Sequence, residues 1–150
     1  MASGQGFSTV SGRNHPELKW QEARTEHFHI IYPEHLRGVE VETAAVAEAT
    51  YAALSANLGV TFDRPVRVYL SDEDEIDNGF AVRVGNGWTN IWINANGAAE
   101  NWTGREKWLR KVVSHEIAHL FHYRATRSSL GLLDMLFSNP LPRFWTEGLA

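Results

Sequence analysis

Apolar and polar residues alternate in two short stretches of the first half of the chain. In residues 26–32, and again in residues 66–70, every second side chain is apolar. A period of two is typical of a β-strand with one buried face. Between them, residues 39–58 are rich in alanine with apolar side chains at helical spacing, and Gly59 suits the position just after a helix. The pattern therefore predicts a strand, a helix of about five turns and a second strand.

A β-hairpin is predicted next. Residues 79–84 and 88–94 resemble strands, and the segment between them contains Gly85-Asn86-Gly87, a strong turn signal. The preceding residues 71–78 are rich in acidic side chains. They lack the ordered glycine and final glutamate of a calcium-binding EF-hand loop, so a solvated loop is the favoured interpretation and a calcium site the alternative.

The second half of the chain is dominated by helical patterns. Residues 105–123 carry apolar side chains at core spacing, and Thr103 with Glu106 fits a capping box at the start of that helix. Residues 128–137 form an apolar segment, interpreted as a short packed helix, with a lid or membrane-touching element as the alternative. Two prolines, at 140 and 142, precede the start of a last helix. The order of elements predicts an α+β fold with a small, mainly antiparallel sheet covered by helices.

Length and composition are those of one domain. The chain has 150 residues; the glycine- and serine-rich residues 1–19 are expected to form a flexible arm, and residues 20–150 the domain. The last residues resemble the first turn of a helix, so we expect the domain to be truncated at its C-terminal end and to belong to a longer protein. No apolar run is long enough to span a membrane, and the first residues lack the features of a signal peptide. Either the protein is cytosolic or a signal has been removed.

Charge and cysteine content exclude several functions. The formal net charge is −4 and there is no basic run, so nothing favours binding to nucleic acid. The chain has no cysteine, which excludes disulfides and cysteine-ligated zinc.

The most informative motif lies inside the predicted helix of residues 105–123. His115, Glu116 and His119 spell H-E-x-x-H. Residues i and i+4 share one face of a helix, so the two imidazoles can converge on one metal ion. Glu116 stands beside them, in the position of a general base that holds the reacting water. The alternative, a surface helix with two incidental histidines, fits poorly with the apolar pattern around the motif.

Two histidines and a water leave a tetrahedral zinc ion one protein ligand short. Glu147 is the best candidate, because it lies 28 residues after His119 on a new helix that follows the proline break. The alternative is a carboxylate that merely stabilises the first turn of that helix through its dipole.

These motifs resemble those of the gluzincin metallopeptidases, a zincin-like family whose third zinc ligand is a glutamate on a second helix. The residues concerned are His115, Glu116 and His119, followed by Trp145-x-Glu147-Gly148-x-Ala150. More narrowly, the segments 26–30, 78–81 and 144–150 and the apolar segment before Pro140 resemble the peptidase domain found ahead of TolB-like β-propellers in bacterial proteins. The similarity covers most of the chain from about Trp20.

The resemblance implies a zinc-dependent peptidase. The Zn²⁺ ligands would be His115, His119 and Glu147, and Glu116 would take a proton from water and pass it to the leaving amine. The substrate would be a peptide or protein pairing with the edge of the strand at residues 88–94. The alternative is that this strand simply completes the sheet. The resemblance also implies export to the periplasm or cell surface and further domains after residue 150.

Two features qualify this expectation. The family usually supplies a second acid and an oxyanion-stabilising Tyr or His beyond the third ligand, which here would lie after Ala150; His122 and Tyr123 are interpreted as structural. The alternative function is a non-catalytic or inactive peptidase-fold module for peptide binding or assembly. Glu116 favours the enzyme, because a scaffold has no chemical need for it.

Overall fold

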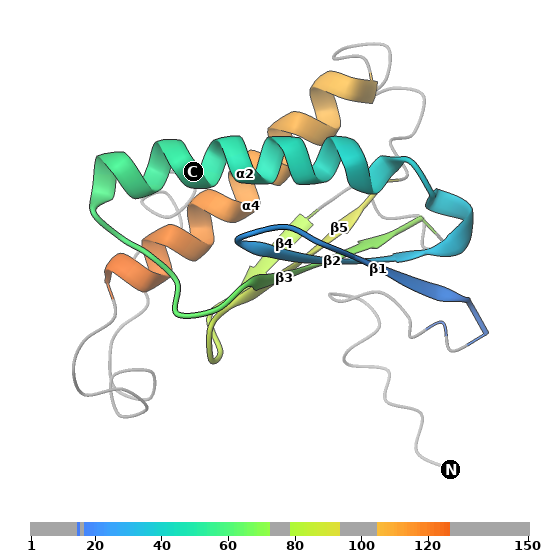
Figure 1. The fold of residues 1–150 in the computed structure, drawn as a ribbon, viewed down its shortest axis with the longest axis horizontal. Coiled ribbons are helices and arrows are strands. Elements are labelled where there is room, and N and C mark those ends of the chain that lie inside the picture. The colour runs from blue at the N-terminus through green and yellow to red at the C-terminus, as the bar shows by residue number, and fades with distance from the viewer. Residues whose placement is uncertain (1–14, 16, 73–78, 94–104, 127–150) are drawn as a thin grey trace.

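The described part of the chain forms one five-stranded sheet with two long helices (Figure 1). This computed structural model describes residues 15, 17–72, 79–93 and 105–126. Its elements, in chain order, are β1 (Trp20–Arg24), β2 (Phe28–Pro33), the 3-10 helix η1 (Glu34–Leu36), α2 (Val39–Leu58), β3 (Val66–Ser71), β4 (Gly79–Val82), β5 (Trp88–Trp92) and α4 (Arg105–Ala125). The α+β class predicted from the sequence is confirmed.

The sheet is mixed, and the prediction of a mainly antiparallel sheet is wrong. Its strand order is β1-β2-β3-β5-β4. The two outer pairs, β1 with β2 and β4 with β5, are antiparallel, whereas β2 with β3 and β3 with β5 are parallel. The parallel pairing of β2 and β3 follows from α2, because a helix between two strands carries the chain back to the end of the sheet at which the first strand began.

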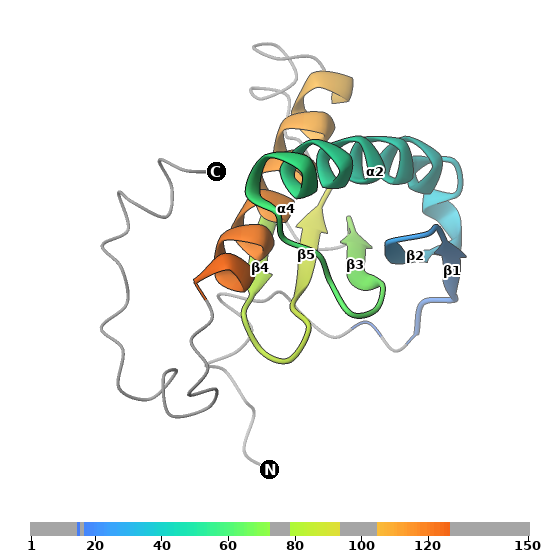
Figure 2. The same ribbon diagram turned by 60° about the vertical axis from the view of Figure 1, so that its left-hand side comes forward.

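Both helices cover the same face of the sheet (Figure 2). Helix α2 packs on β2, helix α4 packs on β4 and β5, and the two helices pack on each other. The core between these layers is made of side chains that are almost fully buried, among them Phe28, Ile30, Val68, Leu70, Ile91, Val113, Ile117 and Phe121. The predicted helical and strand periodicities therefore identify the buried faces correctly.

The predicted hairpin is confirmed. Strands β4 and β5 pair antiparallel, with Gly79 opposite Ile91 and Val82 opposite Trp88. Gly85 and Gly87 in the connection have φ angles of 68° and 81°, a region of backbone conformation that favours glycine.

Strand β1 was not predicted. Its side chains alternate between exposed and half-buried, and of its five residues only Ala23 packs against the hydrophobic core. Because its apolar and polar residues do not alternate, the sequence pattern does not predict this strand. Its backbone pairing with β2 holds it in the sheet. The preceding chain is fixed to it at Trp20, whose indole Nε1 donates a hydrogen bond to the carbonyl oxygen of His15 over 3.1 Å.

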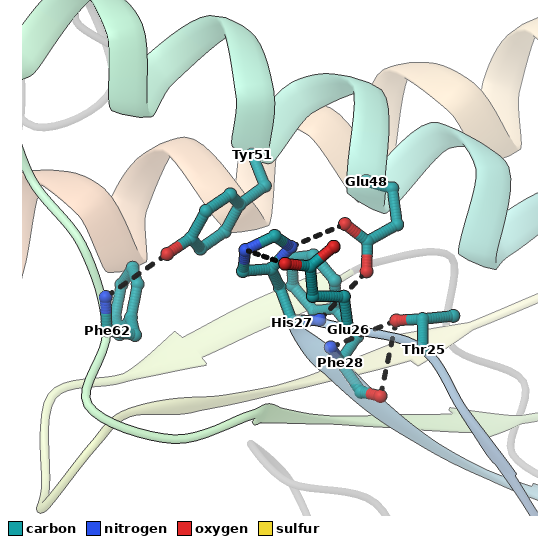
Figure 3. A network of polar contacts seen from close by, with 7 residues as sticks. All are labelled: Thr25, Glu26, His27, Phe28, Glu48, Tyr51 and Phe62. Carbon is teal, nitrogen blue, oxygen red and sulfur yellow. Dashed lines mark hydrogen bonds and ion pairs between the residues drawn. The ribbon is translucent and has the colours of Figure 1, made fainter.

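The turn between β1 and β2 is fastened to α2 by a polar network (Figure 3). The backbone N–H of His27 donates to one carboxylate oxygen of Glu48 over 2.9 Å, and His27 Nδ1 lies 2.7 Å from the other. The His27 ring stacks on Tyr51, with centroids 3.7 Å apart. The sequence pattern places His27 in the predicted strand of residues 26–32. It lies instead in the turn before β2, with its side chain 30% exposed, and joins the sheet to the helix.

Burial acts to raise the pKa of Glu48, but its hydrogen bonds outweigh that effect. The Thr25 side chain, the His27 backbone and the His27 ring all favour the ionised carboxylate, and the pKa of Glu48 lies below its ordinary value. The network is therefore strongest when Glu48 is charged.

Neither of the two long helices in the described residues combines the length and the apolar character that crossing a lipid bilayer requires.

Candidate metal centre

The H-E-x-x-H motif lies in the middle of α4, as predicted. The helix buries Val113, Ile117 and Phe121, spaced four residues apart, against the core. This apolar stripe sets the rotation of the helix about its axis, because each of these side chains is at most 1% exposed. Helix α4 is further held beside α2 by the hydroxyls of Thr50 and Ser114, which lie 3.0 Å apart.

The two histidines of the motif meet on one side of α4. The Nε2 atoms of His115 and His119 are 3.0 Å apart, and their rings make an angle of 84° with centroids 4.5 Å apart. His119 is 6% exposed and His115 is half-buried. Both imidazoles thus present the same ring nitrogen to one point near the surface of the helix.

This geometry fits a pair of zinc ligands. Nitrogen ligands lie about 2.0–2.1 Å from zinc, so two of them on a tetrahedral ion are about 3.3 Å apart. The observed separation of 3.0 Å is within a few tenths of an ångström of that value. The ion would therefore need only a small adjustment of the two side chains.

Glu116 points toward the sheet rather than toward solvent. The residue is buried, with 3% of its surface exposed. It lies under β4, where Gly79 is the residue of the strand that approaches it. The carboxylate that the sequence places beside the histidines is thus enclosed between the helix and the first residue of β4.

The strand next to this site differs from the one predicted to bind a peptide. Strand β5, expected to offer a free edge, lies inside the sheet with β3 on one side and β4 on the other. Among the described strands, the outermost one on the side of α4 is β4, because the hairpin folds β4 outward from β5. The sequence predicts the hairpin itself but not which of its strands is outermost.

The other predicted elements of the site fall on residues 73–78, 94–104 or 127–150, outside the described residues. They are the third ligand Glu147, the apolar segment 128–137, the capping box at Thr103 and most of the acidic loop. Within the described ranges, no group of three or more His, Cys, Asp or Glu side chains gathers as a metal site would require. The described part of the candidate site is the pair of histidines His115 and His119, with Glu116 next to His115 in the sequence.

Comparisons with known proteins give no family. No protein-family model, no curated protein and no solved structure matches this chain. The function is accordingly inferred from the residues of α4 and their contacts with β4.

Tyr123, interpreted from the sequence as structural, is a neighbour of the candidate site. Its ring is nearly parallel to that of His119, with an angle of 14° and centroids 6.1 Å apart. The spacing of four residues from His119 was a signal for this contact, since it places both rings on one helical face. The ring of His122, by contrast, meets Tyr123 edge-on.

Proposed function

We propose that this chain is a zincin-like metallopeptidase domain of the gluzincin type, which hydrolyses peptide bonds with one zinc ion. The observation that carries the proposal is the 3.0 Å approach of the two Nε2 atoms, with the buried Glu116 between them in sequence. A hydrogen bond between two neutral imidazoles would also bring these nitrogens to 3.0 Å, and the buried glutamate next to His115 in the sequence is what favours a metal site. His115 and His119 would hold the ion, and Glu147 would complete its protein ligands.

Bound zinc would polarise the scissile carbonyl and make a water molecule more acidic. The chain itself would supply the proton transfer: Glu116 accepts a proton from the attacking water and delivers it to the nitrogen of the departing amine. Its burial supports this role, because taking a carboxylate out of water costs free energy that a purely structural position would avoid with an apolar side chain.

The substrate proposed for this site is an extended peptide or protein segment. Strand β4 is the outer strand of the sheet on the side of α4, so its outward backbone groups are placed to hydrogen-bond an added strand. Such a peptide would run past Gly79, and therefore past the residue that approaches Glu116. This replaces the inner strand β5 as the proposed docking edge.

Glu116→Gln tests the proposal. In the full chain loaded with zinc, this variant should retain the metal and lose hydrolysis of a mixed peptide library by about 100-fold or more, because the amide cannot accept the proton. Glu26→Gln makes the same chemical change at a side chain that is 84% exposed and should cleave like the unaltered protein.

The outcomes separate the two functions. Unchanged cleavage by Glu116→Gln would refute Glu116 as the base. A zinc-loaded wild-type chain that binds peptides from the library and cleaves none of them would favour the non-catalytic binding module.

A further inference from the structure

Gly79 approaches the side chain of Glu116 more closely than any residue with a Cβ atom could. A Cβ built on Gly79 would lie 2.7 Å from Cγ, 2.8 Å from Oε1 and 3.0 Å from Cδ of Glu116. Distances this short are sub-van-der-Waals for carbon, and either the strand or the glutamate would have to move. The backbone of β4 therefore forms one wall of the space that holds the carboxylate.

The need for glycine here comes from space and not from backbone conformation. The glycines with positive φ among the described residues are 38, 59, 85 and 87, and Gly79 is not one of them. An alanine could adopt the same backbone at this position, but its methyl group would occupy the place of the Glu116 side chain.

The residues of β4 that face α4 have small side chains, which allows the strand to approach the helix closely. Gly79 pairs with Ile91, which is fully buried, and Ala81, the next residue on the same side, packs against the hydrophobic core. Both residues of β4 that face α4 are therefore small. One turn further along α4, Leu120 is approached by another glycine: a Cβ on Gly87 would lie 2.9 Å from Leu120 Cδ2.

We propose that Gly79 is a positioning residue, whose lack of a side chain sets the location of the Glu116 carboxylate in the H-E-x-x-H motif. Its catalytic consequence rests on the proposed function, whereas the contact itself does not. Gly79→Ala would push the carboxylate away from its place while leaving His115 and His119 untouched. Displacing a reacting group by about 1 Å can cost about 100-fold in rate.

The contact is tested by a double-mutant cycle on stability that needs no enzymatic activity. Gly79→Ala should lower the melting temperature of the metal-free full chain by about 3–10 °C, the range expected for an overpacked site. In a Glu116→Ala background the three crowded atoms are absent, and the same substitution should cost almost nothing. Gly87→Ala is a control for additivity: its cost comes from the positive φ of Gly87 and from the contact with Leu120, so it should add to that of Glu116→Ala.

Equal costs of Gly79→Ala in both backgrounds would overturn the contact. If Gly79→Ala alone fails to fold, folding of the Gly79→Ala/Glu116→Ala protein supports the proposal, and failure of both overturns it.

The positioning role is tested on zinc-loaded protein below its melting transition. Gly79→Ala should lower kcat about 100-fold with zinc stoichiometry unchanged, and should have no further effect on kcat in a Glu116→Gln background. A variant with normal kcat would refute positioning even if the stability cycle shows coupling. If the unaltered protein hydrolyses no peptide, the proposed function fails, while the stability cycle still decides whether Gly79 shapes the position of Glu116.

Discussion

The Nε2 atoms of His115 and His119 lie 3.0 Å apart on successive turns of α4. This distance is close to the spacing of two nitrogen ligands on one zinc ion, so the H-E-x-x-H motif has the geometry of a metal-binding pair. Helix geometry brings the two rings to one face, and the packing of α4 on the core decides which way that face points.

Removing either histidine should sharply weaken zinc binding. His115→Ala and His119→Ala are each expected to lower zinc affinity by more than about 100-fold, because even residues outside the ligand set can cost 10–100-fold. Competition against a chromophoric chelator measures the affinity. His35→Ala is the control, because His35 lies on η1 and contacts Asp72. Normal affinity in either of the first two variants would contradict the proposed site.

Glu147→Ala should weaken zinc binding as strongly as loss of a histidine, if Glu147 is the third ligand. The region 127–150 contains one other carboxylate, Asp134, which makes Asp134→Ala a matched control. Metal content after dialysis and chelator competition on the three proteins measure the effect. Loss of zinc in Asp134→Ala, with normal binding in Glu147→Ala, would move the third ligand to Asp134.

Glu48→Gln should destabilise the chain in a manner that depends on pH. The pKa of Glu48 is lowered from its ordinary value of 4.5, so its ionised form stabilises the fold above that pH, and this contribution is lost as the pH falls through the lower folded-state pKa. At pH 7 we expect a loss of about 1–2 kcal/mol of unfolding free energy, the size of a charge-assisted hydrogen bond.

Urea unfolding at a series of pH values tests this effect. The difference between Glu48→Gln and wild type should shrink as the pH falls below 4.5 and through the lowered pKa of Glu48, where its carboxylate becomes protonated. Glu34→Gln, at an exposed side chain with ion pairs of 3.5 and 4.0 Å, should show little difference at any pH. A constant difference across the range would show that the charge of Glu48 is not what fastens the turn.

The hydroxyl pair between α2 and α4 should show coupled energetics. Thr50→Val leaves the half-buried Ser114 hydroxyl without its partner and should cost about 1 kcal/mol, whereas Thr50→Val/Ser114→Ala should cost little more than that single substitution. Thr50→Ser, which keeps a hydroxyl, is the control. Equilibrium denaturation of the set measures the coupling, and strictly additive costs would show that the contact contributes nothing.

The sequence by itself determined the parts of the protein that depend on local spacing. The period of α4 and the four-residue step from His115 to His119 follow from helix geometry, and the glycines at 85 and 87 mark the hairpin because of the backbone angles that its connection adopts. Strands β2 and β3 were predicted from alternation, although β2 begins at Phe28, after the turn made by Thr25 to His27.

The tertiary structure alone decided which segments are neighbours. Alternation shows that one face of a strand is buried but not which strand lies beside it, so the adjacency of β3 and β5 and the outer position of β4 could not be obtained from periodicity. Strand β1 was not predicted because it is held in the sheet by backbone pairing with β2 and has no apolar face that the sequence pattern could show. The contact of Gly79 with Glu116 joins residues 37 positions apart, and only the packing of β4 on α4 reveals that a Cβ atom at position 79 would meet the Glu116 side chain.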